Sequence, residues 1–395
     1  MVIKKFLFLL SIVFSINLYS SSVFLAKMGV EQGFIFNKPK NVDLDLDATN
    51  SINAYFAYKD NLIGLDTLFV YNLDYNGPGI KGYSSGNFTS RSFDNYFLTK
   101  FFYPIDNTVF EFKLDFLYEF YNIGNEKWTE GLYNFGKTGI GSSLTYNLSP
   151  KLILGSGVNI SYVWFPNYTD LETEAINLIE GVSGSVKQNF WQFDFDASID
   201  FKSFLLLIFE YSLIYRIYPD LYVNSVNIMS KENQYDFINM LKFNAVYQKY
   251  DFSLELSINF INYNSNYNYR KIIDYSTLQI DFNKDYLDYN SIEFSLSLLI
   301  FLSSSSTISI TPNIGYKSYS ARHPSKNDGS GALDYSKTEW DLYYGLSLAY
   351  DYKNDDVFSF KPVYVLRIGK SNNNDLLLNN NYVSNYFGFE VTFEY

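Results

Sequence analysis

The sequence predicts an all-β protein, an antiparallel transmembrane β-barrel of about sixteen strands, and three observations predict it. Apolar and polar residues alternate with a period of two over most of the chain. The alternating segments run for about 11–14 residues, and the connections between them are short and long in turn. A tilted strand needs about 9–11 residues to cross a bilayer, whereas strands of water-soluble proteins average about 5–6. Strand length therefore favours a membrane barrel over a soluble sandwich.

The alternation is clearest at residues 108–120. Phe112 and Leu114 share one parity, while Glu111 and Lys113 occupy the other. Successive side chains of a strand point to opposite faces, so this strand has one apolar and one charged face. A soluble core would not accept the charged face, but a water-filled lumen would. The same pattern recurs at residues 191–201, 252–260, 307–317 and 340–351.

The connections alternate in length along the chain. The short ones are expected at Lys59–Asn61, Pro104–Asn107, Ser149–Lys151, Lys202–Ser203, Lys249–Asp251, Ser303–Ser306 and Lys353–Asp356. The long polar ones are expected at Asn37–Ala48, Asp74–Ser92, Asn122–Gly136, Pro166–Lys187, Pro219–Tyr235, Asn264–Asp288, Ser320–Lys337 and Ser371–Asn381. Seven short and eight long connections separate sixteen strands. Because the first two strands and Phe93–Tyr103 alternate less cleanly, fourteen strands are an alternative.

The N-terminus has the layout of a secretory signal peptide. Lys4 and Lys5 precede the apolar run Phe6–Ile16, and small residues follow at Ser20–Ser22. The apolar run is too short to span roughly 30 Å of hydrocarbon as a helix. We therefore expect a signal peptide at residues 1–22 and a barrel domain at residues 23–395.

Composition narrows the function classes. The chain has no cysteine and one histidine, with 30 Lys and Arg against 42 Asp and Glu. The lack of cysteine excludes disulfides, thiolate metal sites and iron–sulfur clusters. The acidic balance argues against a nucleic-acid partner. We expect no cofactor and no nucleic acid.

The chain closes on an alternating strand with an aromatic last residue. Phe389, Val391, Phe393 and Tyr395 share one parity. This end resembles the last strand of bacterial outer-membrane β-barrels, where such residues form the signal read by the barrel-assembly machinery. That family usually ends in Phe, so Tyr395 is a departure, and the resemblance covers the mature chain in pattern without a subfamily motif.

The resemblance is porin-like and implies a location and partners. It implies export to the bacterial outer membrane, with short turns in the periplasm and long loops outside. Outer-membrane lipid and the barrel-assembly machinery are the expected partners. Many porins are trimers, so a homotrimer is one alternative for the oligomeric state.

The polar parity provides the candidate pore-lining residues. It carries fourteen acids against seven bases. An excess of carboxylates around an open lumen attracts cations, although the charges would only brace the wall if they paired with one another. The candidates are Glu111, Lys113, Asp115, Glu119, Asp194, Asp196, Asp200, Glu210, Arg216, Glu255, Glu293, Lys317, Asp341 and Arg367.

The loops offer weaker candidates. His323 is the one histidine available for catalysis, but no serine or acid beside it forms a distinctive motif. Thr169–Glu180 fits a capped helix that either narrows the lumen or packs outside it, and Ser225–Asp236 is a weaker helix candidate. The acids of Asp43–Asp47 lack the glycine and distal glutamate of a calcium loop, so we interpret them as a solvated loop.

These observations favour a pore for passive diffusion of small polar solutes, with a mild cation preference, since barrels of this width leave an aqueous channel. The protein is not expected to be an enzyme. One alternative is a surface adhesin or interaction barrel with ligand-binding loops. The other is a transporter for hydrophobic compounds.

Overall fold

A computed structural model describes residues 23–39, 45–62, 65–78, 90–123, 127–168, 187–223, 232–274, 279–325, 333–354, 357–373 and 381–394. The expected signal peptide at residues 1–22, the helix expected at Thr169–Glu180 and the terminal Tyr395 lie outside this part of the chain. Within it, no helix is long and apolar enough to cross a membrane.

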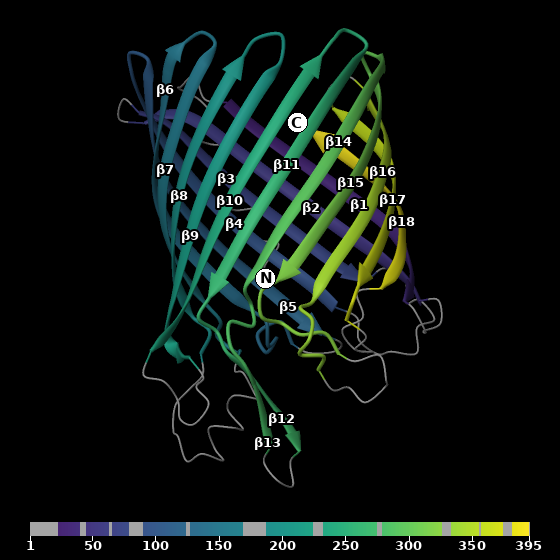
Figure 1. Ribbon diagram of the computed structural model, residues 1–395. Helices are drawn as coiled ribbons and strands as arrows, with labels where there is room; N and C mark the ends of the chain where they lie inside the picture. The colour runs from purple at the N-terminus through teal and green to yellow at the C-terminus, as the bar shows by residue number, and fades with distance from the viewer. Residues whose placement is uncertain are drawn as a thin grey trace.

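The protein is a closed barrel of sixteen strands, each antiparallel to its neighbours (Figure 1). Consecutive barrel strands pair with one another, and β1 pairs with β18 to close the ring. The sixteen-stranded barrel expected from the sequence is thus confirmed, and fourteen strands is wrong. The barrel strands are β1 (Val23–Pro39), β2 (Asp45–Leu62), β3 (Leu65–Pro78), β4 (Ser90–Ile105), β5 (Thr108–Ile123), β6 (Phe135–Ser149), β7 (Leu152–Trp164), β8 (Phe190–Lys202), β9 (Leu206–Tyr222), β10 (Asn233–Gln248), β11 (Phe252–Ser265), β14 (Tyr289–Ser303), β15 (Ser306–Tyr319), β16 (Trp340–Asn354), β17 (Phe358–Ser371) and β18 (Tyr382–Glu394).

The period-two pattern builds the two faces of the wall. Phe97 lies opposite Phe116 across the β4–β5 pair, and the next pair along is Leu98 with Asp115. The Phe97 and Phe116 side chains are 48% and 38% exposed. Large apolar side chains that are exposed in this way around the whole barrel form a surface for lipid rather than for water.

Aromatic side chains also gather at both ends of the outer face. Trp164, Trp191 and Trp340 lie where β7 ends and where β8 and β16 begin, all at the rim with the long loops. At the opposite rim, the short turns carry Phe204 and Tyr250, which are 80% and 97% exposed. Rings at these two levels match the interfacial aromatic belts of membrane barrels.

The short and long connections separate to the two rims. In Figure 1 the short turns lie at the top, and the long connections lie at the bottom together with a small hairpin. Asp106, in the tight turn between β4 and β5, has a φ of 50°, a conformation that Asp tolerates better than most residues. The chain enters β1 and leaves β18 at the short-turn rim, since Val23 pairs with Lys59 close to the first turn and Lys27 pairs with Glu394.

Two expected connections are wrong in position. The short one at Lys59–Asn61 lies within β2, which continues to Leu62. The long stretch Asn37–Ala48 is mostly strand, because β1 and β2 pair with each other through Asn37 and Asp45. The backbone hydrogen bonds between strands form whatever the polarity of the side chains. Polar composition therefore does not distinguish a strand end from a loop. The loop expected at Asp43–Asp47 is likewise wrong for Asp45 and Asp47, which belong to β2, while Asp43 lies outside the described residues.

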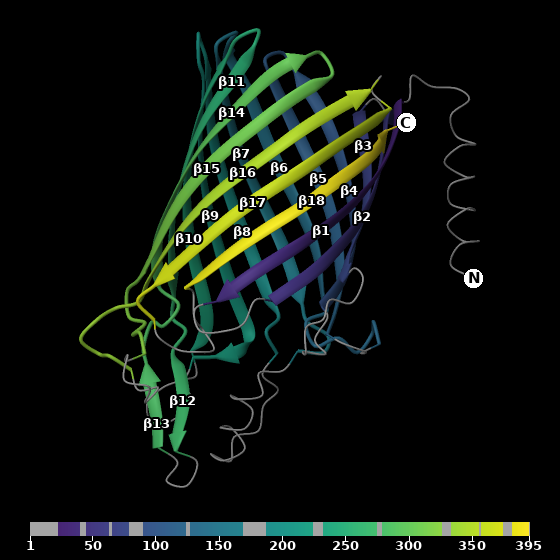
Figure 2. The same cartoon turned by 90° about the vertical axis from the view of Figure 1, so that its right-hand side faces the viewer.

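Two further expectations differ from the structure. The C-terminal part of the helix candidate Ser225–Asp236 is strand, because β10 begins at Asn233 and pairs with β9 and β11. The long connection Asn264–Asp288 contains a two-stranded hairpin, β12 (Tyr269–Asp274) and β13 (Gln279–Asn283). Figure 2 shows this hairpin projecting away from the barrel beyond the rim of the long loops.

Candidate functional site

The inner face of the barrel carries the polar parity of the strands. Across β7, β8 and β9, Asn159 lies opposite Asp194, and Asp196 lies opposite Ser212. The outward neighbour Phe195 is 48% exposed on the apolar face. Strand β8 therefore turns Asp194 and Asp196 toward the lumen, as the alternation predicts.

The strand register places all the predicted candidates on this inner face, and it brings some of them together. Asp194, Asp196 and Asp200 follow one another along β8. Arg367, by contrast, lies on β17, seven strands away around the ring and on the opposite wall from β8. The inner-face candidates are Glu111, Lys113, Asp115, Glu119, Asp194, Asp196, Asp200, Glu210, Arg216, Glu255, Glu293, Lys317, Asp341 and Arg367.

Some of the inner charges are paired across strands. The Lys242 ammonium lies 3.1 Å from the Glu210 carboxylate. The Lys100 ammonium lies 2.9 Å from the Glu111 carboxylate. These pairs are partly exposed to the lumen, so each contributes about 0–1 kcal/mol to stability. Pairing of this kind lowers the number of carboxylates that are free to act on a passing ion.

Other carboxylates on the inner face lie next to one another instead. Asp74 is opposite Asp94, and Asp94 is opposite Glu119, in a row across β3, β4 and β5. Among the described residues, no lysine or arginine lies within ion-pair distance of this row. Asp74 accepts hydrogen bonds from the side-chain amides of Asn53 and Asn72. The row lies at the end of the lumen nearest the long loops and concentrates negative charge there.

Sequence reasoning missed Asp74 and Asp94, for a physical reason. Asp74 was assigned to a loop, although the outward parity continues through Leu73 and Tyr75 into the end of β3. Asp94 lies in the segment whose alternation is blurred, because apolar Leu98 also faces inward. Extending the β3 alternation by two residues would have found Asp74.

Asp236 is a third missed residue, and it is almost fully buried at 1% exposure. Its carboxylate accepts hydrogen bonds from the Tyr218 hydroxyl and the Ser265 hydroxyl, both at 2.7 Å. It lies opposite Arg216 in the β9–β10 register. Asp236 thus joins three strands at the long-loop end, and the arrangement is structural because its carboxylate has little contact with the lumen.

Cations also lie on aromatic rings at this end of the barrel. The Lys317 ammonium is 3.8 Å from the ring centroid of Tyr289 and 4.6 Å from that of Tyr319. Arg216 lies over Phe190 at 5.2 Å. These contacts are cation–π interactions, which fix the position of the side chain while it keeps its charge.

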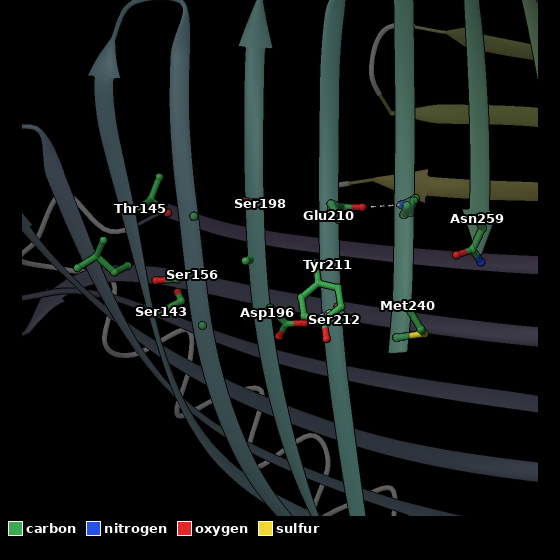
Figure 3. A pocket seen from close by; sticks show the side chains of 15 residues that line it. Ser143, Thr145, Ser156, Asp196, Ser198, Glu210, Tyr211, Ser212, Met240 and Asn259 are labelled. Carbon is green, nitrogen blue, oxygen red and sulfur yellow. Dashed lines mark hydrogen bonds and ion pairs between the residues drawn. The ribbon is translucent and has the colours of Figure 1, made fainter. Parts of the chain in front are cut away.

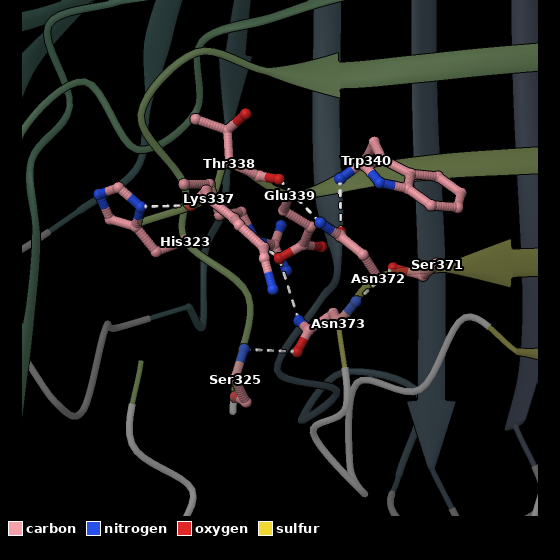
Figure 4. Close-up of polar contacts among 10 residues, drawn as sticks. His323, Ser325, Lys337, Thr338, Glu339, Trp340, Ser371, Asn372 and Asn373 are labelled. Atoms are coloured by element: carbon pink, nitrogen blue, oxygen red, sulfur yellow. Dashed lines mark hydrogen bonds and ion pairs between the residues drawn. The ribbon is translucent and has the colours of Figure 1, made fainter. Parts of the chain in front are cut away.

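The loop after β15 contains a buried ion pair, and hydrogen bonds of Asn373 tie this loop to the one after β17 (Figure 4). The Arg322 guanidinium lies 2.9 Å from the Glu339 carboxylate, which is 1% exposed on its side chain. The Asn373 side-chain amide donates to the same carboxylate at 3.0 Å, and its oxygen accepts from the Ser325 backbone N–H at 3.1 Å. Burial raises the pKa of Glu339 above its ordinary value, although the guanidinium of Arg322 opposes the shift.

His323 lies beside this cluster. Its ring nitrogen Nδ1 is 2.7 Å from the backbone oxygen of Lys337, so this nitrogen donates to a carbonyl oxygen. The ring also packs against Tyr335 with centroids 5.1 Å apart. In a catalytic triad Nδ1 donates to a carboxylate. In His323 this nitrogen donates to a backbone carbonyl instead, so the ring is not oriented by an acid.

No protein-family model matches the chain, and no curated protein matches its sequence. Among solved structures, the chain is similar to OccAB1 of Acinetobacter baumannii, with 8% identity and a TM-score of 0.55 over 94% of this chain and 96% of that chain. It is also similar to the trimer form of OmpT, an outer membrane protein of Vibrio cholerae, with 9% identity and a TM-score of 0.41 over 95% and 99% of the two chains. A variant of the monoaromatic hydrocarbon channel TodX gives 10% identity and a TM-score of 0.41 over 95% and 90%.

At such identities the likeness concerns the fold. A closed antiparallel wall that is apolar outside and charged inside, with short turns at one rim and long loops at the other, defines the class. The protein has the fold of the bacterial outer-membrane β-barrels.

Proposed function

We propose that the protein is a passive outer-membrane channel for small polar solutes, with a mild preference for cations. A barrel of sixteen strands is wide enough to leave an aqueous path through its centre. The observation that supports the preference is the row of Asp74, Asp94 and Glu119 at the end of the lumen nearest the long loops. Cations are attracted to such a row and anions are repelled.

Single-channel recording of the purified protein in planar bilayers tests this proposal. We expect stable ohmic current steps, and a reversal potential in a salt gradient that favours the cation. If the correctly folded protein gives no conductance, the channel proposal is wrong. If it conducts with an anion-favouring potential, only the preference is wrong.

The remaining expectations belong to the same proposal. Residues 1–22 direct export and are removed, the final residues up to Tyr395 are read by the barrel-assembly machinery, and the barrel performs no catalysis. Mass spectrometry of the mature protein from outer membranes would test the cleavage. Crosslinking in those membranes would test whether the barrels form trimers.

The β12–β13 hairpin favours a second candidate, in which the long-loop side also binds a partner. The hairpin extends beyond the barrel rim (Figure 2), where a macromolecule can reach it. Deleting residues 269–283 would abolish adhesion to a partner surface while leaving conductance intact. A hairpin deletion that leaves adhesion unchanged would contradict this candidate.

A further inference from the structure

A cavity of about 450 Å³ lies against the inner wall where β6 to β11 meet (Figure 3). It lies in the half of the lumen nearest the short turns, because Gly155 follows the start of β7 by three residues and Ser198 precedes the end of β8 by four. Small side chains form its floor. They are Ser143, Gly155, Gly157, Ser198 and Ser212.

The two glycines of the floor differ in the space above them. A Cβ atom added to Gly155 would lie 2.3 Å from the Ser198 hydroxyl oxygen, so this oxygen occupies the space that a side chain would fill. A Cβ atom at Gly157 would meet nothing closer than the Ser143 Cβ at 3.4 Å, so the space above Gly157 is open. A Cβ atom at position 157 therefore fits without displacing its neighbours, and the rest of a larger side chain would extend into the cavity.

Polar groups surround this floor on three sides. Asp196 accepts a hydrogen bond from the Ser212 hydroxyl at 2.5 Å. The ion pair of Glu210 and Lys242 lies on the next strands, and their side chains are 43% and 48% exposed. Asn259 lines the far side. The site thus offers carboxylate acceptors, an ammonium donor, and hydroxyl and amide groups that do both.

We propose that this cavity is a subsite for a neutral polyhydroxylated solute of monosaccharide or disaccharide size. The proposal rests on the channel function and names a substrate class for it. Each hydroxyl of such a solute both donates and accepts, which matches the mixture of donors and acceptors in the cavity. The volume lies within the range of about 300–1,000 Å³ that small-molecule pockets have.

The charges of the site favour a neutral solute over a fully charged one. Lys242 already has Glu210 as its partner, and Asp196 already accepts from Ser212. A hydrophobic solute would remove water from these groups without replacing their hydrogen bonds, which is costly. The cavity therefore selects against the hydrophobic compounds of the alternative transporter.

The test measures how glucose and sorbitol affect the current through single channels of the purified barrel. We expect a saturable reduction of current, and no saturable effect of glycine betaine, which is polar but has no hydroxyl groups. The variant Gly157→Val fills the open space above the floor and should weaken the sugar effect about tenfold or more, as expected when several hydrogen bonds are lost. The variant Asp196→Asn keeps the shape and should weaken it less.

Gly29→Val is the matched control. Gly29 also faces the lumen, on β1, and a Cβ atom there has 3.6 Å of clearance, so this variant adds the same volume on a distant wall. It should keep the sugar effect of the unmodified barrel. Equal sugar effects in Gly157→Val and the unmodified barrel would overturn the subsite, and so would equal losses in Gly157→Val and Gly29→Val.

A second measurement separates this proposal from the channel function. Saturation-transfer NMR detects sugar binding by the barrel in a sugar-free detergent, whether or not the barrel conducts. Binding that Gly157→Val removes would support the subsite even if no current is found, in which case only the channel proposal fails. Conductance without sugar block or sugar binding overturns the subsite alone.

Discussion

The Lys242 ammonium lies 3.1 Å from the Glu210 carboxylate, across the β9–β10 pair on the inner face of the barrel. One strand away, Asp196 has a serine hydroxyl as its partner, and no base of the described part of the chain forms an ion pair with it. The inner wall therefore contains both compensated and uncompensated carboxylates within a short distance. Ion selectivity depends on the uncompensated ones, and this distinction leads to the first two predictions.

Neutralising three carboxylates of β8 together should lower the cation preference. The variant carries Asp194→Asn, Asp196→Asn and Asp200→Asn, and it removes three negative charges from one stripe of the lumen. Reversal potentials in a salt gradient measure the change. A control with Asp106→Asn and Asp251→Asn removes carboxylates from the short turns and should shift the potential less. Unchanged selectivity in the triple variant would mean that β8 does not face the permeation path.

Exchanging the charges of the paired residues should leave selectivity almost unchanged. The double variant Glu210→Lys with Lys242→Glu keeps both the net charge and the ion pair. Glu210→Gln alone leaves Lys242 uncompensated and should lower the cation preference. The same reversal-potential measurement separates these outcomes. A large shift in the double variant would show that the position of each charge, and not its compensation, controls ion passage.

A third prediction concerns the closure of the barrel between β1 and β18. The Tyr386 ring lies across Gly33 and Gly388 on the inner face, and its hydroxyl donates a hydrogen bond to Glu31. A Cβ atom at Gly33 would overlap this ring at 2.1 Å. Gly33→Val should therefore displace the ring into the lumen, destabilise the barrel by about 1–3 kcal/mol and reduce conductance.

Gel mobility after heating measures the stability of the Gly33→Val barrel, and single-channel recording measures its conductance. Gly29→Val is again the control, since that position has room for a side chain. If Gly33→Val matches Gly29→Val in stability and conductance, the Tyr386 ring adopts another position without cost and the prediction is wrong.

A fourth prediction concerns assembly. Phe393 lies opposite Met28, and Val391 opposite Val30, so the last strand turns its apolar parity outward, where Phe393 is 54% exposed. If the aromatic end is an assembly signal, Tyr395→Gly should lower the amount of folded barrel in cells. The same variant should fold normally into detergent micelles, where no machinery acts. Phe387→Ala on the same face is the control. An equal loss in both settings would indicate a folding defect instead.

The sequence predicted the faces of the strands better than the contacts between them. Parity alone placed Glu111 and Asp194 on the inner face, because a strand has only two faces. The partner of Glu111, Lys100, could not be predicted, since it depends on the register of β4 against β5. That register is fixed by the turn and by packing along the whole pair, and local residue types do not reveal it.

The long connections were predictable in number but not in extent. Polar composition marked Asn37 and Asp74 as loop residues, although both belong to strands that extend beyond the apolar belt. The polar run Asn37–Pro39 does not alternate, so its pattern cannot be distinguished from that of a loop, whereas at Asp74 the alternation of Leu73 and Tyr75 continues and only the polar composition was misleading. The recessed cavity at Gly155 and Gly157 was also missed, because glycines carry no parity signal and only the three-dimensional wall shows that they adjoin Ser198 and Ser212.

The last prediction concerns the pH dependence of the loop cluster around Glu339. Burial raises the pKa of this carboxyl above its ordinary value of 4.5. Because the folded pKa is raised, the protonated form favours the packed loops. This contribution is fully present below pH 4.5 and is lost as the pH rises through the raised pKa. Hydrogen exchange at Ser325 and Asn373, corrected for its intrinsic pH dependence, should therefore show protection that declines with rising pH.

Glu339→Gln should remove this decline, because the amide keeps an oxygen that accepts from Asn373 but does not titrate. Asp334→Asn is the control, since the hydrogen bonds from Ser336 lower the pKa of Asp334 instead of raising it. The variant Asp334→Asn should change the protection from hydrogen exchange only at acidic pH, because the pKa of Asp334 is lowered. A pH-dependent loss of protection that persists in Glu339→Gln would mean that another group controls the contact between the two loops.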